Sequence, residues 1–146
     1  MANLTQHDFC VLADFRYHIR RFLRFSELAA QAEGLEPQQH QFLLAIEGTS
    51  GPEAPTMGYI ASRLMIHPHS AVGLADRLEE RGLLERIRGG GDRRQVRLRL
   101  TAAGAETLTR LSALHRRELD DSGPELVAAL QAVLRDSPKE AGNVEA

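Results

Sequence analysis

The chain lacks the features that stabilise several classes of protein. Among its 146 residues there is no tryptophan, one cysteine (Cys10) and only 5% aromatic residues. One cysteine cannot form an internal disulfide, and scattered histidines do not have the spacing of zinc ligands, so we expect no structural metal and no cofactor. No apolar run approaches the roughly 18 residues that span a bilayer, and the N-terminus lacks the layout of a signal peptide. We therefore expect a cytoplasmic protein.

The composition favours helices. Aromatic residues are too few for a sandwich or barrel of packed strands, whereas leucine, alanine, arginine and glutamate are abundant. With 42% hydrophobic residues, a chain of this length can fill one core but not two. We expect one domain that is mainly α-helical.

The net charge of −2 conceals a basic region. Residues 56–104 hold nine arginines and five acidic residues, while residues 1–55 and 105–146 each hold three more acidic than basic residues. Within the central region, the stretch from Arg86 to Arg99 has six arginines and a single acid, Asp92. A basic patch on an otherwise acidic molecule indicates contact with nucleic acid.

The first part of the chain reads as two helices. Apolar residues recur at spacings of three and four from Phe9 to about Ala32, which predicts a long amphipathic helix closed by Gly34. A second helix is predicted from Pro37 to Gly48, with proline in its first turn and glycine at its end.

Two short helices are predicted in the middle of the chain. Thr56 is placed to cap a helix that runs to about Leu64, and a second helix begins at Pro68 and ends at Arg81, before Gly82. Two short helices joined by a turn of three to four residues form a helix-turn-helix.

An alternating pattern follows this pair. Residues 83–88 are followed by glycines at 89–91 and by residues 95–100, in which apolar residues alternate with arginines. This predicts a β-hairpin with an arginine-rich outer face and a mobile tip. A helix-turn-helix followed by a basic hairpin is a winged helix. In such a fold the second helix reads the major groove of DNA and the hairpin reaches over the backbone.

The last part of the chain reads as two further helices and a tail. Thr101 is placed to cap a helix that ends near Ser122 and Pro124, and the apolar residues at 126–134 predict a final helix. Residues 137–146 are polar, and we expect them to be disordered. The expected organisation is a winged helix-turn-helix over residues 34–104, flanked by helices at 1–33 and 105–136.

The central region resembles the winged helix of the MarR family of bacterial transcription regulators. The run from Pro55 to Gly104 reads PTMGYIASRLMIHPHSAVGLADRLEERGLLERIRGGGDRRQVRLRLTAAG. The motifs Asp76-Arg77-Leu78-Glu79, Arg81-Gly82-Leu83, Asp92-Arg93-Arg94 and Leu100-Thr101-x-x-Gly104 stand where that family has them. The resemblance implies a DNA-binding repressor whose affinity for DNA is changed by a small phenolic or aromatic acid.

The expected DNA contacts lie on the second helix of the pair and on the hairpin. Ala71, Leu74 and Leu78 share one helix face and should pack inward, which turns the polar face outward. At the hairpin tip, Asp92 is placed to orient Arg94, a role that the resembling family gives to this pattern. The candidate DNA-binding residues are His67, His69, Ser70, Gly73, Arg77, Arg86, Arg88, Asp92, Arg93 and Arg94.

We expect a homodimer. One recognition helix covers a few base pairs, so useful affinity needs two helices about 34–36 Å apart on a pseudo-palindromic operator in double-stranded DNA. The helices at 1–33 and 105–136 are the expected dimer interface, and the alternative is that their apolar faces form an ordinary core within one chain.

Three alternatives remain open. Members of the resembling family bind small acids in a cleft beside the dimer helices, and Arg20, Arg21 and His40 are the candidate effector-binding residues here. A packed histidine and paired arginines are the simpler reading.

Cys10 falls near the thiol position of peroxide-sensing relatives, but the tyrosines of that site are missing apart from Tyr17, which favours an inert thiol. A winged-helix module for protein contacts is a further alternative. The sequence has no nucleophile–base set or phosphate loop, so we do not expect an enzyme.

Overall fold

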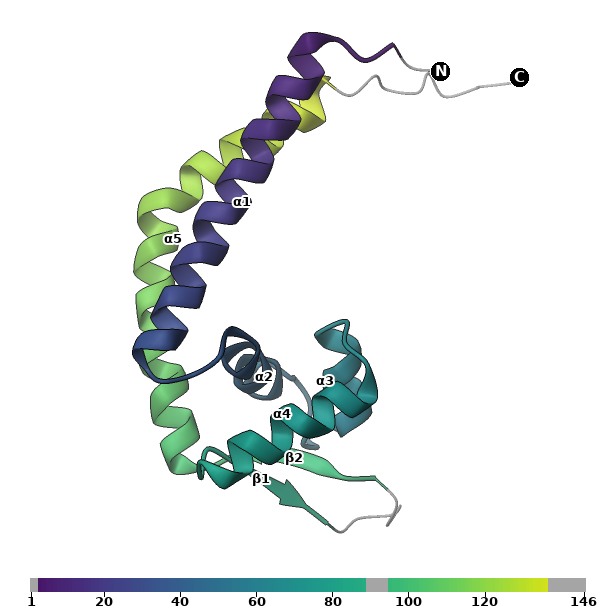
Figure 1. The fold of residues 1–146 in the computed structure, drawn as a ribbon, viewed down its shortest axis with the longest axis vertical. Coiled ribbons are helices and arrows are strands. Elements are labelled where there is room, and N and C mark those ends of the chain that lie inside the picture. The colour runs from purple at the N-terminus through teal and green to yellow at the C-terminus, as the bar shows by residue number, and fades with distance from the viewer. Residues whose placement is uncertain (1–2, 89–94, 137–146) are drawn as a thin grey trace, which may run out of the picture. The chain divides into compact units, whose positions relative to one another are not determined.

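The computed structural model describes residues 3–88 and 95–136, which form five helices and one two-stranded sheet. Figure 1 labels the elements, whose bounds are α1 (Gln6–Ala32), α2 (Pro37–Glu47), α3 (Met57–Arg63), α4 (Pro68–Glu80), β1 (Leu84–Ile87), β2 (Arg97–Leu100) and α5 (Ala102–Asp136). The prediction of a mainly α-helical winged helix with one hairpin is confirmed. The hairpin tip and the tail predicted to be disordered fall outside the described residues.

The chain folds as two compact units. The winged-helix unit is residues 26–114, and the helical unit combines residues 1–25 with residues 115–146. Both α1 and α5 therefore contribute to both units. None of the described helices combines the length and apolarity that crossing a membrane requires.

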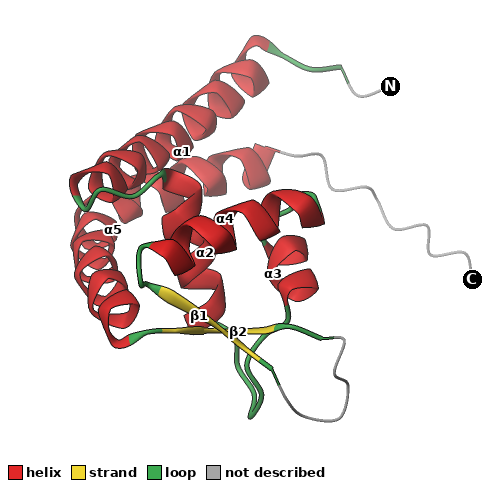
Figure 2. Ribbon diagram, turned by 60° about the horizontal axis from the view of Figure 1, so that its bottom comes forward, coloured by secondary structure: helices red, strands yellow, loops and turns green. Residues whose placement is uncertain are grey.

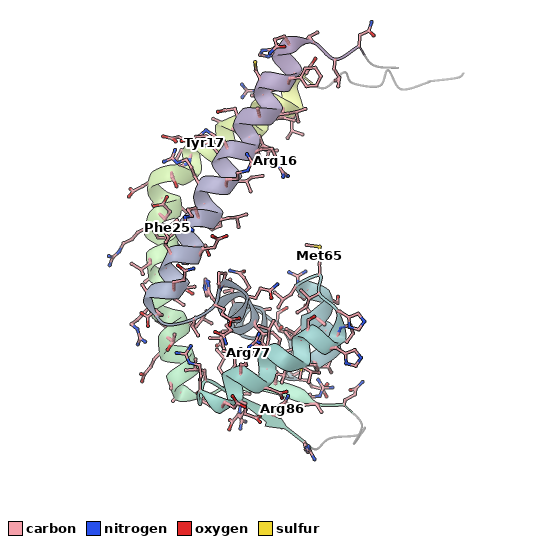
Figure 3. The ribbon with its side chains drawn as sticks, in the orientation of Figure 1. Arg16, Tyr17, Phe25, Met65, Arg77 and Arg86 are labelled. Carbon is pink, nitrogen blue, oxygen red and sulfur yellow. The ribbon has the colours of Figure 1, made fainter. Side chains whose placement is uncertain are left out.

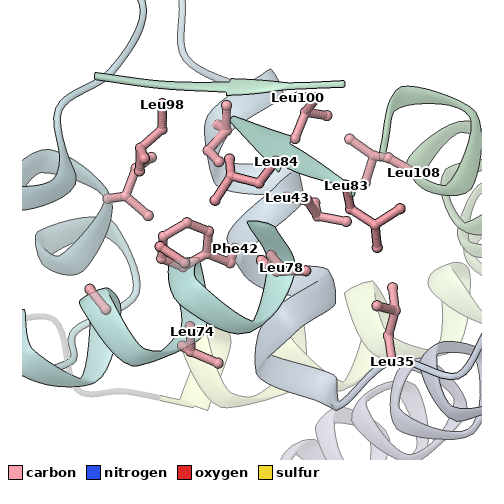
Figure 4. Close-up of a cluster of buried hydrophobic side chains, with 14 of the residues drawn as sticks. Leu35, Phe42, Leu43, Leu74, Leu78, Leu83, Leu84, Leu98, Leu100 and Leu108 are labelled. Atoms are coloured by element: carbon pink, nitrogen blue, oxygen red, sulfur yellow. The ribbon is translucent and has the colours of Figure 1, made fainter. Parts of the chain in front are cut away.

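The core of the winged-helix unit lies between the helices and the sheet. Figure 4 shows its leucines gathered around Phe42, which is fully buried. The strands pair antiparallel, with Leu84 opposite Leu100 and Ile87 opposite Arg97, and Figure 2 shows them crossing beside α3 and α4. The buried positions of the sheet and of α4 thus close over α2. The buried side chains of the core include Leu35, Phe42, Leu43, Ile60, Leu74, Leu78, Leu83, Leu84, Leu98, Leu100, Leu108 and Leu111.

The predicted caps at Thr56, before α3, and at Thr101, before α5, are confirmed. The backbone N–H of Tyr59 donates to Oγ1 of Thr56 (3.2 Å), and that of Gly104 donates to Oγ1 of Thr101 (3.1 Å). The first helix begins three residues earlier than predicted, because Thr5 and Asp8 exchange hydrogen bonds as a capping pair. That pair is a signal that the sequence reading missed.

One turn of the unit uses an uncommon backbone conformation. Helices α1 and α4 are followed by glycines with positive φ, Gly34 (74°) and Gly82 (70°), whereas α3 is followed by Met65 at φ 53°. A left-handed conformation costs an L-residue roughly 1–2 kcal/mol. Met65 is also 92% exposed, so no packing offsets that cost, and Figure 3 shows its side chain projecting from the turn between α3 and α4.

The prediction of two C-terminal helices is wrong. A single helix, α5, runs through Pro124, near which the sequence predicts a helix end. A proline inside a helix removes one backbone hydrogen bond and costs about 3 kcal/mol. Here the apolar repeat continues past it, with Ala129 4% exposed, and the hydroxyl of Ser122 donates to the carbonyl of Glu118 (2.9 Å) one turn back. The helix thus continues past the proline, although Ala129 is the one residue among 125–135 that is buried.

The helical unit is held by aromatic and charged contacts. The His115 ring of α5 meets the rings of Phe22 and Phe25 edge-on, at centroid distances of 6.0 and 5.4 Å. Arg21 donates to Glu125 at 2.9 Å. These contacts join the first part of α1 to the second part of α5.

The start of α5 depends on a close approach at Gly104. A Cβ at this position would lie 2.0 Å from the carbonyl oxygen of Leu83, which directly precedes β1. No side chain fits there, and the backbone of α5 can approach the sheet only because residue 104 is glycine. The same junction is tied by the hydroxyl of Thr101, which donates to the carbonyl of Gly82 at 2.6 Å.

Replacing this glycine should destabilise the fold. We expect Gly104→Ala to lower the free energy of unfolding by about 2–4 kcal/mol, because the added methyl group must displace backbone. The matched control is Gly73→Ala in α4, where a Cβ meets nothing within 4 Å, and we expect a gain of up to about 1 kcal/mol. Urea denaturation measures both. Equal stability of the two variants would contradict the close approach.

Candidate nucleic-acid interface

Helix α4 buries one face and presents the other. Ala71, Leu74, Ala75 and Leu78 are at most 1% exposed, as the periodicity predicts. The opposite face carries His69, Ser70, Asp76 and Arg77, all of them exposed. Since no described element covers this face, α4 offers a row of polar side chains in the position of a recognition helix.

The exposed face of α4 has no side chain at its middle position, Gly73. Gly73 has no side chain, and a Cβ there would meet nothing within 4 Å. Its neighbour Val72 is 41% exposed. A surface without a projecting side chain allows close approach of another molecule, such as the wall of a DNA groove.

Arg77 is held only loosely. Its Nη2 lies 3.4 Å from Oε2 of Glu36, and both side chains are more than half exposed, at 53% and 61%. An ion pair of this kind contributes less than about 1 kcal/mol. Arg77 can therefore leave this pair at little cost, and its role as a DNA contact stays a prediction.

Arg86, one of the expected DNA contacts, has two acidic partners in the structure. Its guanidinium reaches from β1 to α4, where it donates to Asp76 at 2.6 Å and to Glu79 at 3.1 Å (Figure 3). The side chain is 20% exposed, and the hydrogen bond to Asp76 raises the pKa of Arg86 above its usual value. The structure thus makes Arg86 a link between the hairpin and α4, with its charge already neutralised.

Two other hairpin arginines are also paired. Arg97 lies 2.9 Å from Glu53 and donates to the carbonyl of Ala54, while Arg99 pairs across the sheet with Glu85 at 2.7 Å. Ion pairs with Glu53 and Glu85 therefore neutralise part of the positive charge that the arginines of the hairpin carry.

Arg88 and Arg63 are exposed arginines for which the described residues of the winged-helix unit provide no partner. Arg88, directly after β1, is exposed and has no partner within residues 3–88 and 95–136. Arg63, in the last turn of α3, is likewise exposed and unpaired within the described part of the chain. The sequence reading missed Arg63, although a basic residue at the end of the first helix of the pair was a signal. Asp92, Arg93 and Arg94 lie outside the described residues.

The three effector candidates fall into different units. Arg20 and Arg21 belong to the helical unit, where Arg21 pairs with Glu125 and its guanidinium carbon lies 5.9 Å from the centre of the Tyr17 ring. His40 belongs to the winged-helix unit, is 2% exposed and has its Nδ1 3.4 Å from Nε2 of Gln41. His40 is thus a packed core residue in this structure, which agrees with the simpler reading of it.

Neither a reactive-thiol site nor a metal site is formed by the described residues. Cys10 is exposed near the start of α1, and the side-chain amide of Gln6 lies 3.8 Å from its Sγ. Within the described part of the chain, no three histidine, cysteine or acidic side chains cluster closely enough to hold a metal ion.

The geometry defines a class of protein before any comparison. A helix-turn-helix with an exposed polar second helix, followed by an antiparallel hairpin tied to that helix, is a winged helix-turn-helix.

Comparisons with known proteins agree with this class. The model of the MarR family matches residues 33–95. No curated protein matches the sequence. Among solved structures, AbsC, a MarR family transcriptional regulator from Streptomyces coelicolor, is 21% identical, with a TM-score of 0.74 over 93% of this chain and 91% of that one. A mutant of MarR from E. coli complexed with operator DNA is 18% identical, with a TM-score of 0.65 over 94% of this chain and 100% of that one.

A third structure concerns regulation by a small molecule. BpsR from Bordetella bronchiseptica, whose DNA binding is regulated by 6-hydroxynicotinic acid, is 20% identical, with a TM-score of 0.63 over 82% of this chain and 92% of that one. At these identities the structures share the fold with this chain. The family match, which covers residues 33–95, adds that the winged-helix region is similar in sequence to MarR-family transcription regulators.

Removing the link between hairpin and α4 should cost stability. We expect Arg86→Ala to lower the free energy of unfolding by about 1–2 kcal/mol, because it leaves two partners without their hydrogen bonds. Arg99→Ala is the matched control, since its pair with Glu85 is exposed (62% and 46%), and should cost less than about 0.5 kcal/mol. Denaturant titrations measure the free energy of unfolding of both variants. Equal losses would show that the link from Arg86 to α4 does not stabilise the fold.

Proposed function

We propose that the chain is a homodimeric repressor that binds a specific DNA operator through α4 and the hairpin and releases it when a small phenolic or aromatic acid binds. The observation that carries the proposal is the uncovered polar face of α4, which has buried residues on its other side. The exposed Arg88, directly after β1, adds a positive charge on the hairpin. Asp92, Arg93 and Arg94 remain proposed contacts of the hairpin tip.

The contacts divide into two kinds. Arg77 and Arg88 are suited to phosphates, because both are exposed and neither is held by a strong partner within the residues described. His67, His69 and Ser70, at the N-terminal end of α4, are placed where recognition helices contact base edges. Arg86 supports the site by holding the hairpin to α4 and by neutralising Asp76 and Glu79, which would otherwise repel phosphates.

The dimer is supported by apolar surface on the helical unit. Both of its helices expose large apolar side chains, and such surface is costly to leave in water. Val127 (54% exposed) and Leu134 (64% exposed) are seven residues apart and so share one face of α5. The large apolar side chains that the described residues of this unit expose are Leu4, Phe9, Leu12, Tyr17, Leu23, Leu119, Val127, Leu130 and Leu134.

The effector rests on analogy. BpsR, which shares the fold, is regulated by a hydroxylated aromatic acid. Arg20 is exposed and remains the simplest candidate for its carboxylate, whereas Arg21 is paired and His40 is buried. Arg20→Gln should weaken the response of DNA binding to such an acid if this placement is right.

DNA binding is tested by titrating a fluorescent duplex from the region flanking the gene, with random DNA as the reference, at two salt concentrations. We expect tighter binding to the flanking DNA. Arg88→Ala should reduce the slope of log affinity against log salt by about one, because one phosphate contact is lost. Arg116→Ala, an exposed arginine of α5, is the control and should leave the slope unchanged. Equal affinity of the wild-type chain for both DNAs would contradict the proposal.

The dimer is tested by sedimentation. We expect the wild-type chain to sediment as a dimer and the variant Val127→Glu/Leu134→Glu to sediment as a monomer, because two charges would be buried at the interface. Met65→Glu, at a 92% exposed apolar residue of the other unit, is the control and should remain dimeric. A monomeric wild-type chain would refute this part of the proposal.

A further inference from the structure

The first turn of α4 has few backbone groups left for a phosphate. Pro68 has no N–H, the N–H of His69 donates to Nδ1 of His67 (3.2 Å), and the N–H of Ala71 donates to the carbonyl of His67 (3.1 Å). Of the amides that follow Pro68 in this turn, only that of Ser70 has no acceptor among the residues described. This end of α4 is therefore poorly suited to hold a phosphate through its backbone, and recognition falls to its side chains.

The cap determines what the side chain of His67 can do. Because Nδ1 accepts the N–H of His69, it carries no proton in the capped state, and the proton of the neutral ring is on Nε2. Nε2 is then a donor and not an acceptor. The His67 side chain therefore presents one polar group, the Nε2–H donor, to a molecule that contacts α4.

The orientation of this donor is also constrained. The rings of His67 and His69 stack, with centroids 5.1 Å apart and planes 17° from parallel. Both side chains are exposed, so the stack occupies the outer surface at the start of α4. The cap on one ring atom and the neighbouring ring on one face together limit the directions in which Nε2–H can point.

We propose that His67 determines base preference by donating from Nε2 to a guanine in the major groove. Guanine presents two acceptors there, N7 and O6, whereas cytosine presents a donor, adenine an acceptor and a donor, and thymine an acceptor beside a methyl group. A lone donor is satisfied most readily by the edge that carries only acceptors. This inference rests on the proposed function and names the base chemistry that α4 reads.

The test separates the cap from the donor. His67→Ser retains an oxygen that caps the helix, since serine is among the preferred N-cap residues, but it lacks a donor that extends as far as Nε2. His67→Ala loses both. Wild-type and variant chains are each used to select binding sites from a pool of random duplexes, and thermal unfolding reports the cap.

The expected result is a guanine at one symmetric pair of positions in the sites selected by the wild-type chain. His67→Ser should lose that preference, with about a fivefold loss of discrimination at the position, while its melting temperature stays close to that of the wild-type chain. His67→Ala should lose the same preference and also melt at a lower temperature.

Three outcomes would overturn the inference. Retention of the guanine by His67→Ser would show that another group reads it. An equal loss of affinity for every sequence would make His67 a phosphate contact. If the wild-type chain selects no sequence at all, the proposed function fails as well, and this result is distinct from the other two because it appears without any substitution.

Discussion

The arrangement of the winged-helix unit depends on the burial of one face of α4. Ala71, Leu74, Ala75 and Leu78 are almost completely buried in the core around Phe42, and burying such side chains stabilises the fold by roughly 1.5–3 kcal/mol for each large one. With that face buried, the rotation of α4 about its axis is set, and the polar residues of the other face must point outward. The hairpin follows from the same core, because Leu84, Leu98 and Leu100 pack on it.

Electrostatic contacts refine this arrangement. Counting arginines in the sequence overestimates the positive charge available for DNA, since Arg86, Arg97 and Arg99 each have an acidic partner in the structure. The pairs of Arg86 also neutralise two acids on α4, which reduces the repulsion of phosphates in the proposed function. Positive charge is then concentrated at a few exposed positions, which favours directional contacts over general attraction to DNA.

Much of the fold was predictable from the sequence, because its signals are local. The caps at Thr56 and Thr101 and the apolar period of α4 locate the helix-turn-helix and the start of α5. The continuation of α5 through Pro124 was not predictable, since a proline inside a helix removes a backbone hydrogen bond and ordinarily ends or kinks the helix. The role of Arg86 was also missed, because its partners are ten and seven residues away in sequence and become neighbours only when β1 packs on α4.

The central claim is that two copies of the chain place two α4 helices in successive major grooves of one DNA site. Hydroxyl-radical footprinting of the wild-type chain on the DNA that flanks its gene tests this most directly. The account predicts two protected stretches related by symmetry, with centres about 10 base pairs or a small multiple of that distance apart. A single protected stretch without symmetry, or protection that does not depend on sequence, would contradict it.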